Sequence, residues 1–231
     1  MTINFNWRLT AFSAFFLVVF VNLGFWQLDR ASEKEVMMAT REAARVAGPL
    51  MLSEAPLTSG QPVTMRGEFD ENSRFLLDNR VLDGAVGYEV LVPFQATSGQ
   101  TLLVNRGFVA MGRTRQDPPV VPGVPVGEVA LAGEFYQVDD PGPVHAVELG
   151  DSRQWVVQSM AITALGSLAD VSFEPAIVRL AEGQPGALPR YWPDTVMQPE
   201  KHRGYAIQWF AMATALAAIY LFFTFRNKAD D

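Results

Sequence analysis

One of the two histidines in the sequence stands at the start of an uncharged segment near the C-terminus. His202 precedes the apolar run 205–225, in which Gln208 is the only strongly polar side chain. On a helix, the spacing i, i+3, i+4 and i+7 would place aromatic and small residues on the face of this histidine: Tyr205, Ala206, Trp209, Ala213 and Leu216. Neutral imidazole is a common ligand of iron, so this segment could hold a metal through one side chain.

A second polar cluster lies at the end of another uncharged run, near the N-terminus. An aromatic ring, an amide and two cations follow Leu23 there at helical spacing: Trp26, Gln27, Arg30 and Lys34. Arg30 and Lys34 are like charges at i and i+4, which repel each other unless an anion answers them, and Glu33 can answer only part of this charge. A ligand carboxylate is one candidate for the missing anion.

Haem would use both clusters together. Its iron binds an axial imidazole, its ring packs on aromatic surface, and its propionates bind cations near water. We therefore expect His202 to be an axial ligand of haem iron, with further binding residues around it: Trp26, Gln27, Arg30, Lys34, Tyr205, Gln208 and Trp209. Met160, Met197 and His145 are candidates for a second ligand, although His145 lies in a loop rich in Pro and Gly that is typical of a solvated surface.

Both clusters adjoin segments that are long enough to cross a bilayer. Residues 9–28 and 205–225 contain no charged side chain, and about 20 residues at 1.5 Å rise each span the hydrocarbon core. A cleaved signal peptide is the alternative for the first run, but that run is longer than the usual apolar part and no A-x-A site follows it. A buried core helix is the alternative for both runs.

Two membrane-spanning helices are the better interpretation, because both uncharged runs lie at the ends of the chain. The two spans would place the two polar clusters at the same membrane surface. An aromatic belt with snorkelling cations is the simpler explanation of either cluster taken alone. Together the clusters favour a binding site.

The residues between these helices predict one β-rich domain. Residues 29–47 contain helix formers and end at Gly48-Pro49, so they extend the first helix. Strand-like runs at turn-rich spacing follow: 62–70, 74–82, 86–95, 101–111, 128–138, 153–162 and 173–180. LLDNR at 76–80 and LLVNR at 102–106 resemble each other and fit matching strand ends. We expect two transmembrane α-helices that flank a mainly β soluble domain, a sheet or small barrel of the α+β type.

The composition excludes several classes of function. The net charge is −7, and 18 Lys and Arg stand against 25 Asp and Glu, so no basic surface for nucleic acid is expected. The sequence has no cysteine, which excludes disulfides, CxxC redox chemistry and thiolate metal sites. Phosphate-loop, HExxH and GxSxG motifs are also absent from the sequence, so we do not expect an enzyme.

The two end clusters also form sequence motifs. The segment from Leu23 to Lys34 contains LGxWQxxRxxxK, and the segment from His202 to Phe210 contains HxxYAxQWF. With GYEVLVPF, LLVNRGFV and RQWVV in order between them, these motifs resemble the surfeit locus protein family of cytochrome c oxidase assembly factors. The resemblance covers most of the chain.

The resemblance implies a bacterial inner-membrane protein with its central domain in the periplasm. The expected segments are a cytoplasmic N-terminus (1–8), a transmembrane helix (9–28), a helical extension (29–47), a β-rich periplasmic domain (48–200), a second transmembrane helix (205–225) and a cytoplasmic tail (226–231). Lys and Arg flank both sides of the two helices, so positive charge alone does not select this orientation.

The function that the resemblance implies is help in supplying haem a to the catalytic subunit of a haem–copper cytochrome c oxidase, without catalytic turnover. The expected partners are that subunit, a haem a synthase and the lipid bilayer. A scaffold that binds oxidase subunits without haem is the first alternative, in which His202 only packs two helices. A membrane-anchored periplasmic enzyme is the second alternative.

Overall fold

The computed structural model describes residues 6–54, 56–114, 119–138, 144–149, 153–190, 192 and 198–225. The predicted second-ligand candidate Met197 and the predicted tail 226–231 lie outside these residues. The chain forms two compact units. One unit contains the two long helices, and the other runs from Arg41 to Trp192.

The two long helices agree with the predicted apolar segments. Helix α1 covers Trp7–Ala47 and helix α3 covers Pro199–Phe225. Each contains an 18-residue window with fewer than three charged residues, with a mean hydropathy of 2.0 in α1 and 1.7 in α3. Helix α1 ends before Gly48, whose φ of +87° an L side chain rarely adopts. Length and composition therefore fit membrane insertion of both helices.

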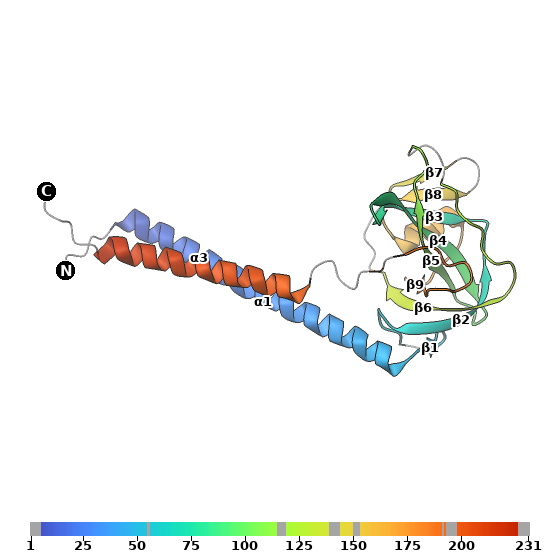
Figure 1. Cartoon of the computed structure of the whole chain (residues 1–231), viewed down its shortest axis with the longest axis horizontal. Helices are drawn as coiled ribbons and strands as arrows, with labels where there is room; N and C mark the ends of the chain where they lie inside the picture. Colours follow the sequence, from blue (N-terminus) through green and yellow to red (C-terminus); the bar gives the residue numbers. More distant parts are fainter. Residues whose placement is uncertain are drawn as a thin grey trace. The chain divides into compact units, whose positions relative to one another are not determined.

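The second unit is built on one nine-stranded sheet that closes into a small barrel (Figure 1). Its strands are β1 (Leu50–Met51), β2 (Pro62–Phe69), β3 (Arg74–Leu82), β4 (Ala85–Ala96), β5 (Thr101–Ala110), β6 (Val129–Gln137), β7 (Ala146–Glu148), β8 (Gln154–Val157) and β9 (Ala176–Leu180). The order β2-β6-β9-β5-β4 closes on itself because β4 also pairs with β2. Strands β3, β8 and β7 continue the sheet beyond β4, and β1 pairs with β2.

The barrel is filled by residues that alternate along its strands. In β2, Val63 and Met65 point inward and are almost fully buried, whereas Thr64 and Arg66, which alternate with them, are exposed. Inward residues of the other strands complete this core, among them Phe94, Val104 and Val178. The period-2 alternation in the sequence therefore corresponds to the inward and outward faces of the barrel strands.

The two similar pentapeptides lie on β3 and β5, the strands on either side of β4, and each contains a β-bulge. Asp78 and Asn79 together oppose one residue of β4, and Asn79 has a φ of +60°. On β5 the register shifts at Arg106, which has no partner in the β4 ladder. Glu89 of β4 ties the two strands, because it accepts a hydrogen bond from Asn105 (2.7 Å). It also lies 3.3 Å from the guanidinium of a β3 arginine.

The bulge on β5 turns Arg106 into the protein, where only 1% of it is exposed. Its guanidinium donates hydrogen bonds to the carbonyl oxygens of Gly186 (2.8 Å), Pro122 (2.9 Å) and Gly123 (2.9 Å). These bonds hold two loops against the barrel. Burial, and to a lesser extent the charge of Arg74, lowers the pKa of Arg106 to about 10, so it stays protonated at neutral pH.

A short helix, α2 (Ile162–Ala169), departs from the sequence prediction. The predicted strand 153–162 is a strand only over Gln154–Val157, and its last residue begins this helix. The buried residues of α2 recur at i, i+3, i+4 and i+7: Ile162, Leu165, Gly166 and Ala169. The helix packs these residues into a second core, which lies against β3 and β8.

Replacing Arg106 with Met should lower the free energy of unfolding of the domain by roughly 3 kcal/mol, because three loop carbonyls lose a buried charged donor. Urea unfolding of the full chain in detergent, followed by near-UV circular dichroism, measures this change. The matched control is Arg113→Met, which removes an exposed guanidinium and should change stability by less than about 0.5 kcal/mol. Equal effects of the two substitutions would contradict the role given to Arg106.

Candidate functional site

Helices α1 and α3 lie side by side and antiparallel (Figure 1). At one end of the pair, the hydroxyls of Thr10 and Tyr220 lie 3.0 Å apart. Further along, the rings of Phe20 and Trp209 pack with their centroids at 5.7 Å. The pairing places the two polar clusters predicted from the sequence at the same end of the helix pair.

Small residues bring the two helices close together. Ala206 and Ala213 of α3 are 1% and 6% exposed, and their side chains are single methyl groups. On α1, a Cβ atom added to Gly24 would lie 2.6 Å from the ring of Phe210. Small residues at such positions let helix backbones approach, which is a common way for helices to associate in membranes.

The close approach brings His202 into contact with Gln27. The Nδ1 atom of the imidazole lies 2.7 Å from the Oε1 atom of the amide, and both side chains are partly buried. Gln27 lies on the α1 face between Gly24 and Ala31, which are both buried, and Gly24 lies against Phe210 of α3. The Nε2 atom of His202 has no hydrogen-bond partner among the residues that the structure describes. One ring nitrogen is therefore held and the other is available.

The two cations that the sequence predicts in α1 differ in their partners. Arg30 lies 2.8 Å from Glu33, and its guanidinium also covers the ring of Trp26. Lys34 makes no ion pair or hydrogen bond with any residue in the described part of the chain, and it is partly buried. Of the two cations predicted to hold propionates, Lys34 is therefore the one without an anionic partner among the described residues.

An ion pair across the two helices was not predicted from the sequence. Arg203 of α3 lies 2.5 Å from Glu35 of α1. Both side chains are about half exposed, so the pair adds little stability. The spacing within one helix could not predict it, because the pair depends on the register of α3 against α1.

The predicted aromatic residues divide into two groups. Trp26 and Tyr205 are 48% and 46% exposed, so their rings are open to the surroundings of the helix pair. Trp209 instead packs against Phe20 within the pair. The helical spacing predicted that Tyr205 shares the face of Ala206. This prediction is wrong, because Tyr205 is exposed and Ala206 is buried. Gln208 is exposed.

The other predicted ligand candidates belong to the second unit. His145 is exposed, as expected for a solvated loop residue. Met160 is partly buried and packs against the core beside α2. Within the described residues, no group of three or more His, Asp or Glu side chains is placed to hold a metal ion. A metal at His202 would therefore have this histidine as its single protein ligand, or a further ligand that does not belong to such a group.

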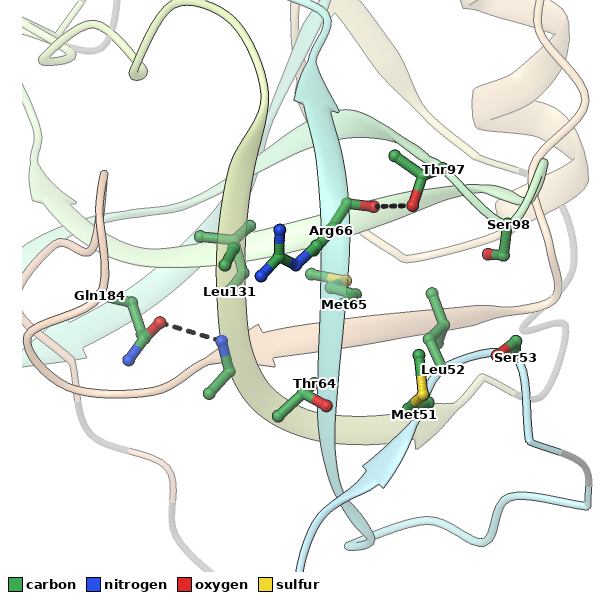
Figure 2. Close-up of a pocket in the computed structure, with 12 residues that line it drawn as sticks. Met51, Leu52, Ser53, Thr64, Met65, Arg66, Thr97, Ser98, Leu131 and Gln184 are labelled. Carbon is green, nitrogen blue, oxygen red and sulfur yellow. Dashed lines mark hydrogen bonds between the residues drawn. The ribbon is translucent and has the colours of Figure 1, made fainter.

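The barrel carries a hollow of about 420 Å³ that the sequence did not indicate (Figure 2). It lies over β2 and β6, with Leu52, Met65 and Leu131 as its apolar floor. Its rim contains Arg66 and Gln184, and the Gln184 amide oxygen accepts a hydrogen bond from the backbone of β6 at 2.9 Å. No carboxylate or imidazole lines this hollow, so its lining is not suited to acid–base chemistry.

The fold and the helix pair define a class of protein in which a small β-barrel domain lies in sequence between two apolar terminal helices. A model of the SURF1 family matches residues 14–214. The chain therefore belongs to the SURF1 family, a membrane-associated family known generally for oxidase assembly factors.

Relatives from several kingdoms are similar over most of their length. "Surfeit locus protein 1" of Mus musculus is 27% identical over 226 residues, covering 87% of this chain and 70% of the relative. The "SURF1-like protein" of Rickettsia conorii is 24% identical over 225 residues, covering 92% and 90%. An uncharacterised SURF1-like protein of Mycobacterium bovis is 27% identical over 206 residues, covering 86% and 75%.

Replacing Gly24 with Leu should weaken the helix pair, because the added side chain would collide with the ring of Phe210. We expect a loss of roughly 1–3 kcal/mol, seen as a lower thermal midpoint of the full chain in detergent. The double variant with Phe210→Ala should recover part of the loss. Gly204→Leu is the control, because a Cβ at Gly204 meets no atom within 4 Å. A Gly24 variant as stable as the control would contradict this packing.

Proposed function

We propose that this protein binds haem a and assists its insertion into the catalytic subunit of a haem–copper cytochrome c oxidase. The observation that carries the proposal is the half-buried imidazole of His202, with one nitrogen held by Gln27 and the other without a partner among the described residues. Membership of a family of oxidase assembly factors supports the same function. The proposal needs binding and release, and no turnover.

The residues of the helix pair fit the chemistry of haem. His202 offers the nitrogen that haem iron binds, and Lys34 offers a cation for a propionate. The contact face between the helices has no room for a macrocycle, because the Phe210 ring already fills the space beside Gly24. The exposed rings of Trp26 and Tyr205 are therefore the aromatic surface available to a bound haem.

The remaining predicted residues have supporting roles in this proposal. Arg30 contributes a weaker contact to a propionate, because Glu33 already shares its charge. Trp209 supports the site from within the helix pair, where it packs against Phe20. Gln208 is exposed and has an amide available for a polar group of the ligand. Bound haem would supply the iron chemistry, and the chain would supply the ligand, the charge and the apolar surface.

A scaffold without haem is the second candidate function, and one observation favours it. The bond between His202 and Gln27 also joins α1 to α3, so the histidine could serve helix packing alone. In that case the oxidase subunit would bind to the barrel or to the helices, and the hollow beside Arg66 would be a candidate contact. Haem binding by the purified protein separates the two functions.

The location that we propose is the bacterial inner membrane, with both helices spanning it and the barrel domain in the periplasm. The apolar windows of α1 and α3 support insertion, and membership of a membrane-associated family agrees with it. Both termini would then be cytoplasmic. The catalytic oxidase subunit and a haem a synthase, which act on haem a, are the proposed partners.

Protease added to intact spheroplasts should cut the barrel domain, because this topology exposes it outside the inner membrane. The measurement is the size of the remaining fragments on a blot against tags at the two termini. Each terminal tag should stay attached to a fragment that contains one apolar helix. Cleavage of the barrel only after lysis would reverse the proposed orientation.

Replacing His202 with Ala should abolish the Soret band of protein purified from cells that make haem a, because the change removes the imidazole that is proposed to bind the iron. Lys34→Gln should weaken haem retention more than Arg30→Gln, since Arg30 is already paired with Glu33. One charge-assisted contact is worth roughly 1.5–3 kcal/mol when well formed, so each of these losses should be partial.

The control for the charge changes is Arg8→Gln, which removes an exposed cation at the opposite end of α1. It should leave haem retention unchanged. A wild-type Soret band in the His202 variant would remove the ligand role. A wild-type protein that never carries haem, but that co-purifies with oxidase subunits, would establish the scaffold function instead.

A further inference from the structure

We infer that Gln27 is a positioning residue, which fixes His202 in the tautomer with hydrogen on Nδ1 and so makes Nε2 the iron-binding atom. The inference deepens the proposed haem function and rests on it for the role of Nε2. It assigns to Gln27 a contact with the histidine in place of the contact with the cofactor that the sequence predicts. The hydrogen bond itself is a feature of the chain alone.

The atoms in contact determine the tautomer. An amide carbonyl oxygen can only accept a hydrogen bond, so the Nδ1 atom 2.7 Å from Oε1 of Gln27 must carry the hydrogen when the ring is neutral. The lone pair of the neutral ring then lies on Nε2. Neutral imidazole in water favours the other tautomer, so the partner at Nδ1 is what selects the nitrogen that can bind metal.

The surroundings of Gln27 hold its amide in place. Gly24, one turn before it, lets the Phe210 ring of α3 pack closely, and Ala31, one turn after it, is only 2% exposed. These small neighbours let α3 come near enough for a hydrogen bond between two side chains. Neither Gln27 nor His202 has another hydrogen bond or ion pair with the residues that the structure describes. The two groups therefore depend on each other.

An amide at this position also has a consequence for release. A carboxylate that accepts the Nδ1 hydrogen would increase the basicity of Nε2 and tighten its bond to iron, as carboxylates do beside many metal-binding histidines. The uncharged amide of Gln27 is a weaker acceptor. It would orient the ring but leave a bond from iron to Nε2 weaker than a carboxylate would, which suits the proposed release of haem.

The tautomer is tested without haem, by ¹⁵N NMR of the full chain in detergent with labelled histidine. Only two histidines contribute, and His145→Gln identifies the signals of His202. In the neutral ring, we expect the hydrogen on Nδ1 in the wild type and in Gln27→Glu, and a shift toward the Nε2–H tautomer in Gln27→Leu. Asn22→Leu, which removes an exposed amide from the same helix, should leave the signals unchanged.

The effect on release is tested by the rate at which haem passes from each variant to an excess of an apo haem-binding acceptor. We expect Gln27→Leu to lose haem ~10-fold faster than the wild type and Gln27→Glu to lose it more slowly, since partners of metal-binding histidines change affinity by about 10–100-fold. A purely structural amide would make both variants lose haem equally fast. The order of the three rates of haem loss therefore distinguishes a Gln27 that positions the His202 ring from a Gln27 that only packs the helices.

The outcomes distinguish the inference from the proposed function. An Nε2–H tautomer in the wild type, or the same tautomer in the wild type and Gln27→Leu, overturns the inference whether or not haem binds. Equal haem loss from the Leu and Glu variants overturns the control of release by the amide. A wild type with the Nδ1–H tautomer that binds no haem overturns the proposed function and leaves the role of Gln27 in fixing the ring supported.

Discussion

The candidate site depends on one hydrogen bond, which joins the imidazole of His202 to the amide of Gln27 across two apolar helices. A polar ring beside an apolar segment needs a partner, because an unmade hydrogen bond costs more there than in water. That partner comes within reach only where the helices are close, and Gly24, Ala31 and Ala206 provide the closeness.

The barrel domain is stabilised by different means. Its strands alternate inward and outward, and two bulges beside β4 interrupt this alternation where polar residues enter the interior. Arg106 is the extreme case, because this buried cation donates its hydrogen bonds to backbone carbonyls and not to carboxylates. Such an arrangement orders the loops around the barrel, and Gln184, which lies in the same loop as Gly186, also lines the hollow beside Arg66.

The sequence predicted the long elements well, because each has a strong and simple pattern. The uncharged runs predicted both helices, the break at Gly48-Pro49 predicted the end of α1, and alternation predicted seven of the strands. The short elements β1, β7 and α2 were missed, since two, three or eight residues carry too little periodicity to stand out. The closure of the barrel depends on the pairing of β2 with β4, which no local pattern encodes.

The residues of the candidate site were proposed from the sequence, but the contacts among them were not. Helical spacing placed both polar clusters on helices, but the contact between His202 and Gln27 follows from the register of one helix against the other. The same register produces the ion pair of Glu35 with Arg203 and directs Trp209 toward Phe20. Spacing within one helix contains no information about these pairs, so Tyr205 and Trp209 could not be distinguished until both helices were present.

Pulsed EPR of the haem-bound full chain, with ¹⁵N in its histidines, tests the central claim most directly. The chain has only two histidines, so the label is close to site-specific. We predict a ¹⁵N coupling to the ferric iron that persists in the variant His145→Gln. A haem-bound protein with no ¹⁵N coupling, or one that loses the coupling with His145 and keeps it without His202, would contradict the account.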